Sequence, residues 1–188
     1  SAFLRATAIA EKNLGPDHPI VAILIGNLAS MYEEQGRVDE AIALHLRELD
    51  IGEKTLGPEH PDVATTLNNL GITYLGKQDL EKAEPMFRRA LAISEKILGP
   101  EHPDVANALN NVAAIYMKTK RYEEALPLEE RALAIHTKSF GAKHPMVATT
   151  LRTLAGVHAS LNRFDSAEAL IDQAIEIQRA VYGENHPE

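Results

Sequence analysis

Five histidines recur at one fixed interval, and histidine serves in proteins both as a general acid–base group and as a metal ligand. They are spaced 42 residues apart, at His18, His60, His102, His144 and His186. Each lies in a copy of one motif: LGPEHPDVA occurs letter for letter from Leu56 and from Leu98, and looser copies begin at Leu14, Phe140 and Tyr182. This spacing gives two histidines no reason to share one ion, so the pattern favours capping and loop packing over a metal or acid–base array.

Other patterns of catalytic residues are missing from the sequence as well. It contains no cysteine, no H-E-x-x-H, no phosphate-cradling glycine loop, no calcium loop and no nucleophile paired with a base. The acidic pairs Glu33-Glu34 and Glu129-Glu130 lie in charge-rich segments, where such pairs are typical of solvated helix faces. We therefore expect no enzymatic activity, no cofactor and no metal site.

The constant interval also predicts how the chain is organised. Four full periods of 42 residues fit, at 15–56, 57–98, 99–140 and 141–182. Residues 1–14 are predicted to form the second helix of a truncated repeat, and residues 183–188 the start of a further one. The sequence thus reads as one repeat array, 1–188, taken from a longer array.

Each period carries two amphipathic stretches with helical spacing. In the second period Val63, Leu67, Leu70 and Tyr74 form one apolar stripe, and a second stripe follows Leu80. The break between the stripes is short enough to make the two helices antiparallel. The motif joins successive pairs, with a glycine to end one helix, an extended histidine as N-cap and a proline at the first helical position of the next.

These positions resemble the tetratricopeptide repeat, whose usual period is 34 residues. The matching residues are Leu67, Leu70-Gly71, Tyr74, Ala83, Phe87 and Ala90, and Phe3 and Ala6 match Phe87 and Ala90 one repeat earlier. The longer period, the LGPxHPxVA junctions and NNL in the first helix resemble kinesin light chains and related bacterial repeat proteins. The resemblance covers essentially the whole chain. It implies an all-α fold, a right-handed superhelical solenoid of antiparallel helix pairs.

Three asparagines stand at one point of successive first helices: Asn27, Asn69 and Asn111. Asparagine is a poor helix former because its amide competes for the backbone, so its return at this point calls for a reason. The resemblance implies that first helices line a concave groove, where such an asparagine ladder binds the backbone of an extended peptide. The alternative is that these amides cap, bind water or hydrogen-bond within the array.

Other residues are expected in the groove around the asparagines. They are Asn68, Asn110, Arg152, Thr65, Asn107, Leu75 and Met117, together with Ile23 and Thr149. Animal kinesin light chains that take tryptophan-acidic cargo motifs rely on further lysine or arginine in the groove, which this chain lacks one turn before the ladder. In the fourth repeat Thr153 replaces the asparagine, which indicates the end of the ladder, a different specificity or simple drift.

Composition narrows the choice of partner. A net charge of −8 with both signs mixed along every repeat argues against nucleic acid, and the longest apolar run, IVAILIG, is far short of the roughly 18 to 20 residues that cross a bilayer. The absence of cysteine fits the cytoplasm. We expect a protein-binding adaptor or scaffold that takes an extended peptide and is monomeric, with a dimer through truncated ends as the other state. The rival functions are a self-associating spacer and a regulatory array attached to a catalytic or nucleotide-switch domain outside these residues.

Overall fold

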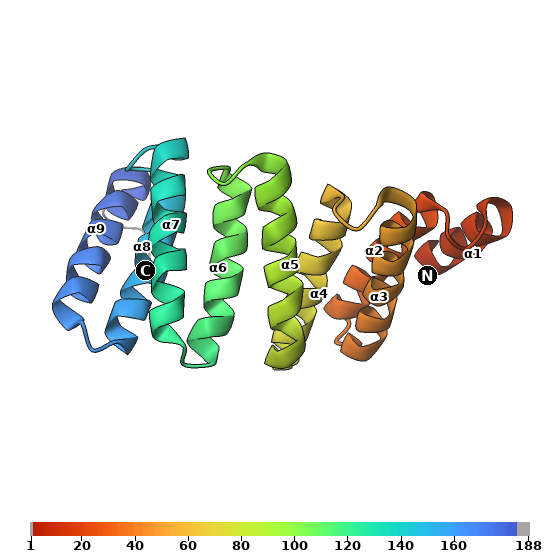
Figure 1. The fold of residues 1–188 in the computed structure, drawn as a ribbon, viewed down its shortest axis with the longest axis horizontal. Coiled ribbons are helices and arrows are strands. Elements are labelled where there is room, and N and C mark those ends of the chain that lie inside the picture. Colours follow the sequence, from red (N-terminus) through yellow and green to blue (C-terminus); the bar gives the residue numbers. More distant parts are fainter. Residues whose placement is uncertain (1, 184–188) are drawn as a thin grey trace. The chain divides into compact units, whose positions relative to one another are not determined.

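The structure is a computed structural model that describes residues 2–183, and those residues form α-helices and short connections without strands. The chain divides into two compact units, Ser1–Ile97 and Leu98–Glu188. The helices of the first unit are α1 (Ala2–Leu14), α2 (Pro19–Glu34), α3 (Val38–Leu56), α4 (Pro61–Gly76) and α5 (Leu80–Leu98). Those of the second are α6 (Pro103–Lys118), α7 (Tyr122–Phe140), α8 (Pro145–Ser160) and α9 (Phe164–Tyr182) (Figure 1).

Successive helices within each unit form antiparallel pairs, as the short breaks between the apolar stripes predict. In the first unit α2 packs on α3, and α4 packs on α5 through Phe87 and Gly71. In the second unit α6 packs on α7 and α8 on α9 (Figure 1). Contacts of α3 with α4, and of α7 with α8, join one pair to the next inside its unit. The last five residues of the sequence, which include His186 and most of the predicted further repeat, lie outside the described residues.

The histidines of the repeated motif act as helix caps, as the sequence predicts. His60 is extended, at φ −73° and ψ 147°, and its Nδ1 accepts a hydrogen bond from the backbone N–H of Asp62 at 3.2 Å. Pro61 takes the first helical position, where a missing N–H costs nothing. The same geometry opens α2, α6 and α8, at His18, His102 and His144. The ring nitrogen that a metal would need is therefore engaged by the backbone.

An arginine on the second helix holds the junction in place. The guanidinium of Arg89 in α5 donates to the backbone oxygen of Pro58 at 3.1 Å. Arg47 and Arg131 make the same contact with Pro16 and Pro100 in their own repeats. Each second helix is thus fastened to the loop that begins its own pair, which explains why the loop can keep one conformation from repeat to repeat.

The core of each pair is built from the predicted apolar stripes. Val63, Leu67, Leu70 and Tyr74 are all buried on α4, and their equivalents on the other first helices are buried too. Positions that are always small allow close approach of the second helix: Ala41, Ala83 and Ala125 are fully buried.

One prediction about the acidic pairs is wrong. Glu129 was expected on a solvated face, but its side chain is buried, with only 2% of the residue exposed. The reason is register: residue 129 lies one period after Phe87, a core position that faces the first helix of its own pair. A pair of adjacent acidic residues does not reveal which of them faces inward, whereas the repeat alignment does.

Candidate functional site

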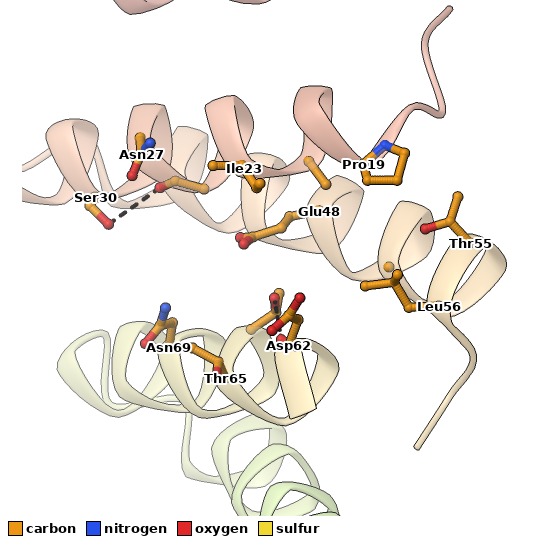
Figure 2. Close-up of a pocket in the computed structure, with 14 residues that line it drawn as sticks. Pro19, Ile23, Asn27, Ser30, Glu48, Thr55, Leu56, Asp62, Thr65 and Asn69 are labelled. Carbon is orange, nitrogen blue, oxygen red and sulfur yellow. Dashed lines mark hydrogen bonds between the residues drawn. The ribbon is translucent and has the colours of Figure 1, made fainter. Parts of the chain in front are cut away.

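A groove runs between α2 and α4 in the first unit, with α3 as its floor. Its volume is about 430 Å³. Figure 2 shows the two walls facing each other across this space, with the side chain of Glu48 between them. The lining residues are Pro19, Ala22, Ile23, Gly26, Asn27, Ser30, Glu48, Gly52, Thr55, Leu56, Asp62, Thr65, Thr66 and Asn69.

Two of the predicted ladder residues stand in this groove. Asn27 projects from α2 and Asn69 from α4, on opposite walls (Figure 2). Asn27 is exposed and Asn69 half-buried, and neither side-chain amide makes a hydrogen bond to another residue within the described chain. Both amides therefore keep a donor and an acceptor available to a bound group.

The groove contains some, though not all, of the residues predicted around Asn27 and Asn69. Ile23 and Thr65 line it, one turn before the two asparagines. The hydroxyl of Thr65 is turned to its own helix and donates to the backbone oxygen of Pro61 at 3.3 Å. Asn68 and Leu75, on the same helix, are half-buried and lie outside this lining.

The other predicted residues belong to the second unit. Asn107 on α6 and Arg152 on α8 are exposed, whereas Asn111 and Met117 on α6 are half-buried. Arg152 makes no hydrogen bond or ion pair with another residue in the range 2–183. These side chains are on first helices, at the positions that the repeat predicts.

Asn110 has a partner inside its own repeat. With its amide nitrogen turned toward acceptors, it donates to the backbone oxygen of Ala106 and to Oε2 of Glu129, both at 3.2 Å. Burial raises the pKa of the Glu129 carboxyl to about 7, and a hydrogen bond with Thr153 on α8 opposes that rise. Glu129 thus connects α7 with the helices on either side of it, and Asn110 serves packing within the unit.

A second buried polar cluster lies beneath the groove in the first unit. His45, which is fully buried on α3, has its Nδ1 2.9 Å from Oε2 of Glu48. Its Nε2 lies 3.6 Å from Oε1 of Glu33 on α2, and the hydroxyl of Thr73 on α4 donates to the same carboxyl. These contacts bind the two walls of the groove to its floor. None of the described residues forms a group of three or more histidines, cysteines or carboxylates placed to hold a metal ion.

Glu48 and Gly26 are groove residues that the predicted set of peptide-binding residues missed. The sequence held a sign of them, because Glu48 interrupts a column that is otherwise alanine, at Ala6, Ala90, Ala132 and Ala174. Asp62 and Gly52 also line the groove and carry no comparable mark in the sequence. In the part of the chain that the structure covers, no helix combines the length and the apolar character needed to cross a membrane.

Comparisons with known proteins agree with this architecture. The family model for the tetratricopeptide repeat matches residues 21–96, 76–115 and 104–180. BtubC (BKLC) from P. vanneervenii has a similar solved structure, with 28% sequence identity and a TM-score of 0.86 over 99% of this chain and 74% of that one. So has a Podosopora anserina protein described as a kinesin light chain with nearly identical TPR-like repeats, at 28% identity and a TM-score of 0.85, over 95% of this chain and 84% of that one.

A more distant match shows the fold alone. Aspartyl phosphate phosphatase F from Bacillus subtilis is 16% identical, with a TM-score of 0.74 over 89% of this chain and 42% of that one. A comparison of the sequence with curated proteins found no match. The predicted fold class, an all-α solenoid of tetratricopeptide type, is confirmed by the family model and by the solved structures. A scaffold for protein–protein interaction is the general role of this fold, which is typically non-catalytic.

Proposed function

Because the chain belongs to the tetratricopeptide repeat family, we propose that it binds an extended segment of a partner protein in the groove between α2 and α4. The observation that supports this most strongly is the pair of amides, Asn27 and Asn69, that face the groove without a hydrogen-bond partner among the described residues. The proposed mechanism is recognition of the partner's backbone by these two side chains.

A side-chain amide suits this task because it offers both a donor and an acceptor. It can pair with the C=O and the N–H of a peptide unit whatever side chain the ligand carries there. Packed helices are spaced about 8 to 10 Å apart and an extended chain rises about 3.3 Å per residue, so one asparagine per first helix meets about every third residue of the ligand. Asn111 has the same position on α6 and is proposed to act likewise in its own unit.

The rest of the groove offers surfaces for side chains of the bound segment. Ile23 is 63% exposed and Leu56 is 40% exposed, an uncommon state for large apolar residues in a helical pair. Both line the groove, beside Ala22 and Pro19. Covering this apolar surface would stabilise a complex, and the amides would set the direction and register of the bound chain.

The experiment uses a phage-displayed library of random peptides selected on the purified protein. The best selected peptide is synthesised with a fluorescent label, and its Kd is measured by anisotropy with the parent chain and with an Asn27→Ala/Asn69→Ala variant. We expect at least a tenfold loss of affinity, which is about 1.4 kcal/mol or roughly one hydrogen bond's contribution.

The matched control is Gln173→Ala, which removes an exposed amide from α9. It should leave the Kd unchanged, and both variants should unfold at the temperature of the parent. A library that yields no binding peptide would overturn the proposal. So would a selected peptide that binds the double variant as tightly as the parent.

A further inference from the structure

Glu48 places a carboxyl group where the repeat otherwise has a methyl group. The equivalent residues on the other second helices are alanines, and two of them, Ala132 and Ala174, are fully buried. The Glu48 side chain is only 17% exposed, and it forms part of the groove floor between α2 and α4 (Figure 2). A carboxyl group with this little contact with water is costly to keep unless something binds it.

One of its two oxygens is already bound. His45 Nδ1 lies 2.9 Å from Oε2, and since a carboxylate can only accept, the imidazole must donate in this pair. The fully buried His45 thus fixes the direction in which Glu48 points. Oε1 makes no hydrogen bond or ion pair to any other residue described.

The free oxygen owes its place to Gly26 on the facing helix. A Cβ added at Gly26 would lie 2.5 Å from Oε1 and 2.8 Å from Cδ of Glu48. The later first helices carry Asn68, Asn110 and Arg152 at this point, opposite alanine. Glycine and glutamate therefore occur together in the one repeat where a carboxyl group must fit beneath α2.

The surroundings of Oε1 favour a cation. The groove lining includes a second carboxyl group, that of Asp62, and no lysine, arginine or histidine. A partly buried carboxylate gains more from a hydrogen-bonded cation than an exposed one does, since solvent and salt screen the pair less. The apolar stem of a lysine or arginine side chain would also find Ile23 and Leu56 to pack on.

We propose that the groove between α2 and α4 selects partner segments that carry a lysine or arginine side chain, whose cation pairs with Glu48. This inference rests on the proposed function and deepens it: Asn27 and Asn69 hold the backbone of the segment, and Glu48 decides which segment is held. It assigns the groove a preference for basic sequences.

The test uses the peptides selected from the phage-displayed library. We expect lysine or arginine to be enriched at one position of these peptides. The Kd of the labelled peptide is then measured with the parent chain and with Glu48→Gln, and again for a peptide in which norleucine replaces the enriched basic residue. Glutamine still accepts from His45, so this variant removes the charge and keeps the shape.

The expected result is a coupled loss. Glu48→Gln should weaken the basic peptide at least tenfold and leave the norleucine peptide almost unaffected, and rising salt should weaken only the pair with both charges. The matched control Glu81→Gln removes an exposed carboxyl from α5 and should change neither Kd. Gly26→Ala is a second variant, expected to weaken the basic peptide by displacing the Glu48 carboxyl.

Failure of this inference can be told apart from failure of the proposed function. Peptides without a preferred basic residue, or a basic peptide that binds Glu48→Gln as tightly as the parent, would overturn the role of Glu48. If such peptides still lose affinity with Asn27→Ala/Asn69→Ala, backbone recognition in the groove stands. Indifference to both sets of variants would overturn both.

Discussion

The first two full repeats, 15–56 and 57–98, fill the same internal space in different ways. In the second, the ring of Phe87 packs so close to α4 that a Cβ at Gly71 would lie 2.7 Å from its Cε1. In the first, the equivalent pair is His45 and Ala29, and both residues are fully buried. The smaller imidazole leaves room for the extra methyl group, and it brings a polar atom into the core.

That polar atom explains the remaining differences between the two repeats. His45 needs a partner in the core, and Glu48 supplies it from the next turn of α3. Glu48 in turn needs the space above Gly26. The second repeat has Ala90 and Asn68 at these two points. One change in the core is thus followed by two compensating changes, and the last of them shapes the floor of the groove.

The largest expected effect concerns the hydrophobic version of this space. Phe87→Ala empties a fully packed site, and we expect it to lower the free energy of unfolding by about 3 to 5 kcal/mol, measured by urea denaturation followed by circular dichroism. Phe164→Ala is the control, because Phe164 is 63% exposed at the start of α9. Equal losses in the two variants would contradict the view that the space behind the first helix carries the stability of the repeat.

The third repeat extends the comparison, since Glu129 occupies the position of Phe87 and His45. Its folded pKa, about 7, lies above the ordinary value of 4.5, so the folded chain holds a proton that the unfolded chain releases between these values. The stability that this proton represents is complete below about pH 4.5 and is lost as the pH rises through 7. At about 1.4 kcal/mol for each tenfold change in proton affinity, the loss is on the order of 3 kcal/mol.

The measurement is the free energy of unfolding across this pH range for the parent and for Glu129→Gln. Glutamine does not titrate, so the difference between the two curves isolates the carboxyl group from all others. We expect the variant to gain on the parent as the pH rises. Parallel curves would show that Glu129 ionises without cost in the folded protein.

A smaller effect separates the two glycines that face the second helices. Gly71→Ala should lower the free energy of unfolding by about 1 to 2 kcal/mol, because overpacking against the buried ring outweighs a gain of about 1 kcal/mol in helix propensity. Gly26→Ala should change it by less than about 1 kcal/mol, since the atoms in the way end a side chain that can swing into the groove.

Gly156→Ala provides the baseline for these two variants. No atom lies within 4 Å of the Cβ that this change would add in the interior of α8, so it should stabilise the chain by up to about 1 kcal/mol through propensity alone. The comparison fails if Gly26→Ala costs as much as Gly71→Ala, measured by the same urea titration.

Much of the fold could be predicted from the sequence, because its determinants are local and repeated. The cap at His60 and the helix start at Pro61 depend on residues next to one another, and the buried stripe from Val63 to Tyr74 depends on helical spacing. The positions of the asparagines on first helices followed from the same period. The burial of Glu129 was missed because the adjacent charges were read as one exposed face.

The sequence by itself thus determined the helices, their ends, their pairing and the small residues that let them pack, since each follows from contacts within a repeat that the period makes visible. The tertiary structure decided where the free amides of Asn27 and Asn69 stand and why Glu48 points between them. The physical reason is that Glu48 takes its direction from His45 on its own helix and its space from Gly26 on another. Only packing brings these three residues together.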